Sequence, residues 1–212
     1  MLFLPLLPKT VRKECMKKSV VLMLVLTIVT PLLAQNWDVN TLQHINGWGG
    51  NFIHDYSSFI SKSEPYIAMG VPLAMGLTGW LKNDEGLMKD AMVVGMSVAS
   101  AYVFAYGMKL VFDRPRPYEA YPDLIYPRSY EDSSSFPSGH TASAFALATS
   151  LCIRYPKWYV IAPSALWAGS VAFSRMHEGV HYPTDVMAGA ALGIGLTIGS
   201  HYLSKWLNKK LF

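Results

Sequence analysis

Residues 137–146 read Pro-Ser-Gly-His-Thr-Ala-Ser-Ala-Phe-Ala, a tight turn that leads directly into an apolar segment. Proline and glycine set the turn, and we expect a helix to begin there. The N–H groups at the beginning of a helix, together with the helix dipole, attract anions. Ser138 could donate to an anion oxygen, Gly139 lets the backbone approach it closely, and His140 is placed to transfer a proton. A simple serine N-cap with an incidental histidine explains this stretch equally well when it is taken alone.

The apolar segment after this turn is one of five. They cover residues 66–81, 91–112, 141–153, 158–173 and 186–207. Their period is helical, with no alternating strand pattern, so we expect an all-α fold. Some are shorter than the ~20 residues that a membrane-spanning helix prefers, so a soluble helical bundle is the alternative. Small residues are dense in 186–200 and permit close helix contacts. We predict a membrane bundle of five to six helices.

The composition favours a membrane protein. The 212-residue chain is 51% hydrophobic and 15% charged, whereas the usual charged fraction is about 25%. The net charge is +4, but no basic run with interleaved aromatics occurs, so we expect no nucleic-acid partner. The two cysteines, Cys15 and Cys152, have no metal-ligand spacing. We therefore predict no metal site and no disulfide between them.

The N-terminal region resembles an export signal. Residues 16–35 read Met-Lys-Lys, then a long apolar run, then Leu-Leu-Ala-Gln, which predicts a signal peptide that ends at Ala34. An uncleaved first transmembrane helix is the alternative, and Met16 rather than Met1 could be the true start. In either case Gln35 begins outside the cytoplasm.

These features divide the chain into an N-terminal segment, residues 1–34, and one domain over residues 35–212. Residues 37–64 mix aromatic and polar residues at spacings of three and four. We expect them to form an amphipathic, partly helical segment on the membrane surface or against the bundle.

Basic residues predict the orientation of the bundle. If Lys17 and Lys18 are cytoplasmic, alternating the sides places three further basic groups with them. These groups are Lys82 with Lys89, Arg154 with Lys157, and Lys205 with Lys209 and Lys210. This pattern obeys the positive-inside rule. It predicts that the loops over residues 113–140 and 174–185 lie together at the outer face.

The first of these loops follows a cation at the end of an apolar segment. Arg116 follows Lys109 by seven residues and stands within Arg-Pro-Arg-Pro, residues 114–117, whose prolines stop the helix and stiffen the loop. Both cations could ligate phosphate oxygens, Arg116 by its planar fork and Lys109 as a point charge. We expect Arg114 to be a surface residue or a neighbour of these two. A helix end with snorkelling cations is the alternative.

The second loop carries an arginine, a histidine and a carboxylate. Asp185 follows His181 by four residues, so its carboxylate could bind one imidazole nitrogen and leave the other free as a nucleophile. Arg175 could clamp phosphate oxygens in bidentate fashion. An aspartate helix cap beside a histidine is the alternative. We expect His177 to be structural and Glu178, like Glu119, to lie near the mouth of the site.

The three segments together resemble the signature of the type 2 phosphatidic acid phosphatase superfamily. The signature is Lys, six residues, Arg-Pro; then Pro-Ser-Gly-His; then Ser-Arg, five residues, His, three residues, Asp, and each position is matched here. The family includes lipid phosphate phosphatases, bacterial acid phosphatases and vanadium haloperoxidases. The resemblance spans about residues 66–205 and implies a helical bundle with metal-independent, two-step phosphate hydrolysis.

The resemblance also implies a role for each signature residue. His181 is the nucleophile that forms a phosphohistidine, Asp185 supports it, and His140 protonates the leaving group. The phosphate is held by Lys109, Arg116, Ser138, Gly139 and Arg175.

The sequence therefore predicts a membrane phosphatase with no cofactor, whose partners are the membrane and a lipid phosphate. Candidate substrates are undecaprenyl diphosphate, phosphatidylglycerol phosphate, phosphatidic acid and the phosphates of lipid A. A soluble periplasmic acid phosphatase is the first alternative, and a vanadate-dependent haloperoxidase is a weaker one. We expect the bacterial inner membrane with a periplasm-facing site, and the periplasm or outer membrane are the alternatives.

Overall fold

The computed structural model describes residues 36–211, with side chains as far as residue 202. The predicted signal over residues 16–35 lies outside the described residues, so its cleavage after Ala34 stays a prediction, as does the domain boundary there. One compact unit spans Thr41–Phe212. The candidate site belongs to this unit.

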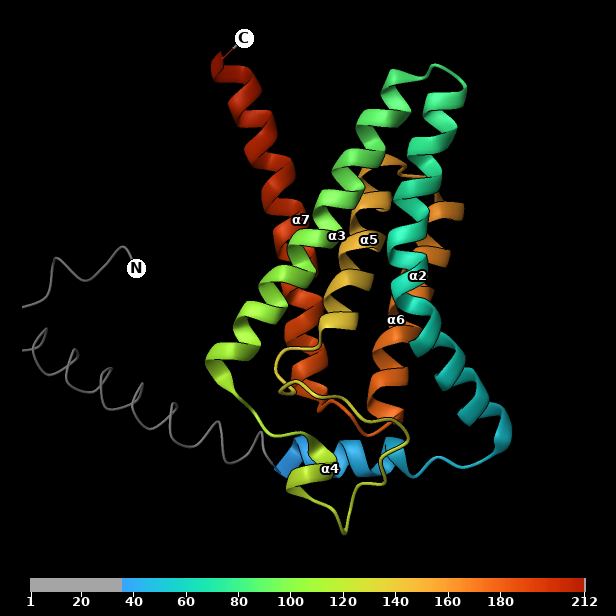
Figure 1. The fold of residues 1–212 in the computed structure, drawn as a ribbon, viewed down its shortest axis with the longest axis vertical. Coiled ribbons are helices and arrows are strands. Elements are labelled where there is room, and N and C mark those ends of the chain that lie inside the picture. Colours follow the sequence, from blue (N-terminus) through green and yellow to red (C-terminus); the bar gives the residue numbers. More distant parts are fainter. Residues whose placement is uncertain (1–35, 212) are drawn as a thin grey trace, which may run out of the picture. The chain divides into compact units, whose positions relative to one another are not determined.

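Helices make up the regular structure of residues 36–211, and no strand occurs among them (Figure 1). They are α2 (Asn51–Leu81), α3 (Glu85–Phe112), α4 (Pro117–Ala120), α5 (Gly139–Arg154), α6 (Trp158–His177) and α7 (Pro183–Leu211). A further short helix covers residues 36–46. Five of the labelled helices are long, and α4 is a single turn in the loop after α3. The predicted all-α fold is confirmed.

Helix α2 differs from the prediction. It runs unbroken through Pro65 and Pro72, so the expected division between residues 37–64 and 66–81 was wrong. It begins after Gly50, whose φ of 108° ends the preceding loop. Its buried positions form one stripe at helical spacing, namely Ser57, Ser61, Glu64, Ala68, Pro72 and Gly79. The first half of this stripe is polar, so a search for apolar residues does not detect it.

Helix α5 is central to the bundle, since it packs against α3, α6 and α7. Its contact with α7 is close because glycines face it. A Cβ atom on Gly189 would lie 2.5 Å from the Ser138 carbonyl oxygen, and one on Gly193 would lie 2.2 Å from that of Ala142. The predicted close packing through the small residues of 186–200 is therefore confirmed.

The two ends of the bundle differ in character. The α2–α3 and α5–α6 turns lie at one end, and the loops that precede α5 and α7 lie at the other (Figure 1). At the first end Arg154 Nη1 lies 2.9 Å from Asp90 Oδ1, and the Tyr155 hydroxyl donates to Asp90 Oδ2 at 2.9 Å. This arrangement agrees with the predicted grouping of the basic turns away from the three polar segments.

Helix α3 is suited to a membrane. The segment Glu85–Ala120, which contains α3, is long and apolar enough to cross one, with a mean hydropathy of 1.5 over its best window, of which 33% is buried. It exposes large apolar side chains, including Leu110, Val111 and Phe112. Such a surface matches hydrocarbon better than water.

Candidate active site

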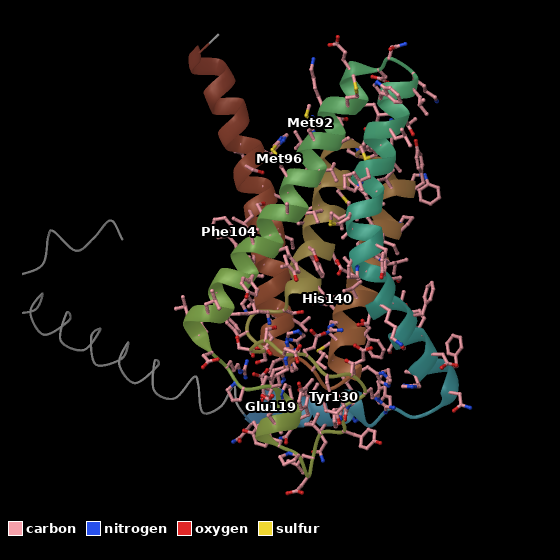
Figure 2. The ribbon with its side chains drawn as sticks, in the orientation of Figure 1. Met92, Met96, Phe104, Glu119, Tyr130 and His140 are labelled. Carbon is pink, nitrogen blue, oxygen red and sulfur yellow. The ribbon has the colours of Figure 1, made fainter. Side chains whose placement is uncertain are left out.

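The predicted site residues belong to the loop end of the bundle, where α3 and α6 end and α5 and α7 begin. His140 marks this region in Figure 2. The predicted residues are Lys109, Arg116, Ser138, Gly139, His140, Arg175, His181 and Asp185. All are buried except His140, which is partly exposed. The three segments that are separate in sequence thus form one cluster.

His181 lies between a carboxylate and a guanidinium. Its Nδ1 is 3.6 Å from Asp185 Oδ2, and its Nε2 is 3.4 Å from Arg116 Nη1. The first distance exceeds a hydrogen bond, so the bond expected between this pair is not formed, although the carboxylate faces the correct nitrogen. Since Arg116 can only donate, the Nε2 that faces it is best unprotonated. Burial, followed by the charges of Arg116 and Arg175, holds the pKa of His181 well below its usual value.

Asp185 is fully buried and is held by three neighbours. Its Oδ1 accepts from Arg114 Nη1 at 2.6 Å, and its Oδ2 accepts from the Tyr182 backbone N–H at 2.9 Å. Its own carbonyl oxygen accepts from the Ser138 N–H at 3.1 Å, which joins the beginnings of α5 and α7. Arg114 also lies over the Tyr182 ring, 3.8 Å from its centroid. Arg114 is therefore the partner of Asp185, so of the two roles expected from the sequence, a surface residue or a neighbour of the site residues, the structure supports the second.

Arg116 is fixed by backbone oxygens of two segments, residues 133–134 and residue 180. Its Nε donates to the Ser133 carbonyl at 2.8 Å and its Nη1 to the Val180 carbonyl at 2.9 Å. Lys109 Nζ donates to the Ser134 carbonyl, which also lies within reach of Arg116 Nη2 at 3.4 Å. The two cations are therefore neighbours whose orientation is set before any ligand arrives.

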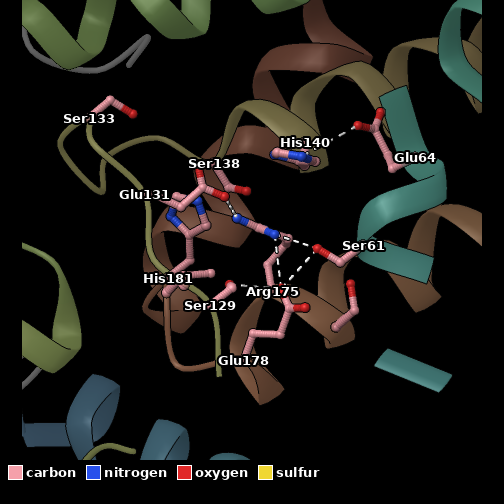
Figure 3. Close-up of polar contacts among 12 residues, drawn as sticks. Ser61, Glu64, Ser129, Glu131, Ser133, Ser138, His140, Arg175, Glu178 and His181 are labelled. Atoms are coloured by element: carbon pink, nitrogen blue, oxygen red, sulfur yellow. Dashed lines mark hydrogen bonds and ion pairs between the residues drawn. The ribbon is translucent and has the colours of Figure 1, made fainter. Parts of the chain in front are cut away.

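Arg175 is surrounded by acids (Figure 3). Its Nη1 donates to Glu178 Oε2 at 2.9 Å and to the Ser61 hydroxyl, and its Nη2 is paired with Glu131. Burial is the largest single influence on Glu131 and acts to raise its pKa. The charge and hydrogen bond of Arg175, together with the charges of His140 and Arg116, outweigh burial and hold this pKa below its usual value. Burial raises the pKa of Glu178 against the opposing charge of Arg175. Arg175 Nε is buried without a partner among the described residues.

The beginning of α5 combines a cap with the predicted anion site. Ser138 Oγ accepts from the Thr141 N–H at 3.4 Å and lies 2.9 Å from the Thr141 hydroxyl. The serine N-cap is thus real, and it does not consume the hydroxyl proton of Ser138. A Cβ on Gly139 would meet only the Tyr102 ring, at an ordinary 3.8 Å. The packing of the protein alone therefore does not require glycine there.

His140 faces a carboxylate that no motif contains. Its Nε2 lies 4.0 Å from Oε2 of Glu64, a residue of α2 that is only 2% exposed. The other oxygen, Oε1, accepts from the Ser143 hydroxyl at 2.7 Å. Sequence reasoning missed Glu64, since it lies far from the signature. The buried stripe of α2 at helical spacing was the signal that could have found it.

The loop over residues 121–138 is anchored by Asn46. The Asn46 amide donates to the carbonyls of Tyr126 and His177 at 2.9 Å each, and its Oδ1 accepts from the Tyr126 N–H at 2.8 Å. His177 is fully buried, with Nε2 at 3.1 Å from the Trp48 carbonyl. The expectation that His177 is structural agrees with these contacts.

Glu119 caps the beginning of α4, since its Oε2 accepts from the Arg116 N–H at 2.9 Å.

A groove of about 1120 Å³ leads away from the site between α2 and α3. Glu64, His140 and Ser143 line one end of it. Most of its remaining wall is apolar and includes Met69, Leu73, Met92 and Val98.

Within residues 36–211, no group of three or more histidine, cysteine or acidic residues is arranged to hold a metal ion.

Known proteins share both the sequence and the fold. A family model described as the PAP2 superfamily matches residues 90–209. The chain is 30% identical over 189 residues to a lipid A 1-phosphatase of Porphyromonas gingivalis. The aligned region covers 87% of this chain but only 38% of that protein. It is 31% identical over 166 residues to a lipid A 4'-phosphatase of Bacteroides thetaiotaomicron, covering 74% of this chain and 72% of the relative.

The arrangement of helices is shared with a solved membrane protein. The transmembrane PAP2 type phosphatidylglycerolphosphate phosphatase from Bacillus subtilis superimposes with a TM-score of 0.66 at 23% identity, over 91% of this chain and 96% of that one. At this identity the likeness speaks for the fold alone. The family model covers more than half of the chain, and the Bacteroides relative is matched over most of its length, so the chain belongs to the PAP2 superfamily.

Proposed function

We propose that this chain hydrolyses a phosphate ester or diphosphate of a membrane lipid in two steps, through a phosphohistidine on His181. The observation that carries the proposal is the placement of His181, buried between Asp185 and Arg116 in a cluster whose other histidine, His140, lines an apolar groove. An imidazole kept neutral by its surroundings is a competent nucleophile. Fixed cations beside it suit the charge of a phosphoryl group.

In the first step His181 Nε2 attacks the phosphorus atom. A P–N bond forms, the P–O bond to the lipid breaks, and His140 gives its proton to the departing oxygen. Asp185 faces Nδ1 and stabilises the positive charge that the imidazole acquires. The equatorial oxygens lie against Lys109, Arg116 and Arg175, with the N–H groups at the beginning of α5 as further donors.

In the second step a water molecule attacks the phosphohistidine. His140, now neutral, accepts a proton from this water, the P–N bond breaks, and inorganic phosphate leaves. His140 thereby returns to its protonated form and His181 to its neutral form. Residues of this chain supply every proton transfer, so we propose that no metal ion takes part.

A lipid is the substrate class that the surroundings of the site favour. The groove that begins at Glu64 and His140 is apolar along most of its wall, as an acyl or prenyl chain requires. The named relatives act on lipid A, which supports a phosphorylated lipid of this kind. We place the protein in the bacterial inner membrane with the site at the periplasmic face, because the basic turns lie at the opposite end.

A substrate panel tests this proposal. Protein purified in detergent is assayed with lipid A, undecaprenyl diphosphate, phosphatidylglycerol phosphate, phosphatidic acid and p-nitrophenyl phosphate, with and without EDTA. We expect a preference for one lipid, no effect of EDTA, and loss of activity in His181→Ala. Equal or faster hydrolysis of the small soluble ester would contradict a lipid substrate, and an EDTA-sensitive rate would contradict the metal-free scheme.

A further inference from the structure

Glu64 is a buried carboxylate for which the two-step scheme above has no use. It comes from α2, a helix that contributes no signature residue. One of its contacts is the Ser143 hydroxyl at 2.7 Å. The other is His140 Nε2 at 4.0 Å (Figure 3). No lysine or arginine in the described part of the chain forms an ion pair with it within 4.0 Å. A buried carboxylate is costly unless it is compensated, which suggests that it has a function.

The proton on His140 faces unfavourable charges. His140 must be positively charged when the leaving group departs, but three fixed cations surround it. The charged groups that act on it are Arg175 from α6, Arg116 and Glu131 from the loops, Lys109 from α3 and Glu64 from α2. Glu131 is already paired with Arg175. Glu64 is therefore the carboxylate left to compensate the charge of a protonated His140.

The groove places Glu64 on the side of the leaving group. Glu64, His140 and Ser143 line the end of the groove nearest the site, whereas Arg116 and Arg175 do not line it. If the lipid lies in the groove, its scissile oxygen meets His140 from the side on which Glu64 sits. The phosphoryl group itself lies toward the cations.

We propose that Glu64 is a positioning residue for proton transfer. Its carboxylate orients His140 and stabilises the protonated imidazole, which leaves His140 ready to protonate the departing lipid oxygen. Ser143 holds this carboxylate in place through its bond to Oε1. The inference rests on the proposed function and deepens it, because it assigns the proton supply of the first step to a residue outside the signature.

The test compares leaving groups that differ in their need for a proton. An alkyl alcohol leaves poorly without protonation, whereas p-nitrophenolate leaves readily. Glu64→Gln is compared with the unchanged protein using octyl phosphate and p-nitrophenyl phosphate, and kcat/KM is measured because it covers the steps up to departure of the leaving group. We expect kcat/KM for octyl phosphate to fall roughly 10-fold to 100-fold, part of the 10²–10⁴ that general acid catalysis supplies. For p-nitrophenyl phosphate we expect a fall of less than about 3-fold.

The pH profile gives a second readout that a merely structural role would not move. Removing the carboxylate destabilises the protonated imidazole, so the basic limb of kcat/KM for octyl phosphate should move to lower pH in Glu64→Gln. Glu64→Asp keeps the charge and should retain more activity than Glu64→Gln. If Glu64→Gln fails to fold in detergent, the pH profile of Glu64→Asp replaces it, with a smaller shift in the same direction. Asp55→Asn removes an exposed carboxylate from the same helix and should leave both rates unchanged.

Equal losses with both esters, or an unmoved basic limb, would overturn the role of Glu64. The proposed function fails differently, when the unchanged protein hydrolyses no phosphate ester or when His181→Ala retains its rate. The two failures are therefore distinguishable in one set of assays.

Discussion

Asp185 depends on Arg114 for charge compensation. The carboxylate is fully buried, and its contact with Arg114 at 2.6 Å supplies the opposite charge. Removing one partner of a buried charged hydrogen bond leaves the other without compensation. We expect Arg114→Gln to lower the free energy of unfolding by about 1.5–3 kcal/mol, as for hydrogen bonds to charged groups. We also expect a roughly 10-fold fall in kcat/KM, because Asp185 is then poorly placed to support His181.

Arg154→Gln is the matched control for this change. Arg154 is exposed to a similar degree and is paired with Asp90 at 2.9 Å, but at the other end of the bundle. Denaturation midpoints and steady-state kinetics are measured for both variants. Unchanged activity in Arg114→Gln, or an equal loss in Arg154→Gln, would show that the Arg114–Asp185 pair has no special role in catalysis.

The sequence predicted the signature residues of the site, Asp185 included, but not the carboxylates of Glu64 and Glu131. Lys109, Arg116, His140, Arg175 and His181 stand in short motifs whose spacing indicates their chemistry. Their acidic partners Glu64 and Glu131 stand in no motif. Glu64 comes from another helix, and Glu131 from an irregular loop whose path depends on tertiary contacts such as those of Asn46. Partners of this kind are set by packing, which a local pattern does not encode.

At the scale of elements, the contact of α7 with α5 determines where the site residues lie. Gly193 allows the two backbones to approach, and α5 carries Ser138 and His140 at its beginning. We expect Gly193→Ala to destabilise the protein by about 1–3 kcal/mol, as overpacking usually does. Activity should fall with it, because the helices must separate near the site.

Gly195→Ala is the control on the same helix. A Cβ on Gly195 meets nothing within 4 Å, so the change removes glycine without adding a clash. We expect it to be neutral or stabilising by up to about 1 kcal/mol, the usual difference in helix propensity. Thermal unfolding of both variants in the same detergent measures the effect. Equal stability of the two would contradict the role of close α5–α7 packing.

The helices themselves were predicted well from periodicity, except in α2. Four of the predicted apolar segments correspond to α3, α5, α6 and α7. These helices carry apolar residues along most of their length, so the sequence pattern detects them. The prediction failed where α2 buries Ser57, Ser61 and Glu64. There the buried face is polar because it faces the site, so a hydrophobic pattern could not reveal that the helix continues.

At the scale of the whole molecule, the two ends of the bundle should face opposite sides of the membrane. Tyr130 is 77% exposed at the site end, and Lys82 is exposed at the turn between α2 and α3. Single cysteines at these positions, in a chain without its two native cysteines, are treated with an impermeant maleimide on intact cells. We expect Tyr130→Cys to be labelled at once and Lys82→Cys only after lysis. The reverse pattern would place the site in the cytoplasm.

The central claim is that His181 carries the phosphoryl group during turnover. The most direct measurement mixes the protein with its preferred lipid substrate, denatures it within the first turnover in alkali, and determines by mass spectrometry which peptide carries phosphate. We expect phosphate on the Nε2 of His181, absent in His181→Ala and lost as inorganic phosphate appears. Product formed in the first turnover with no phosphate on His181, or with phosphate on another residue, would contradict this account.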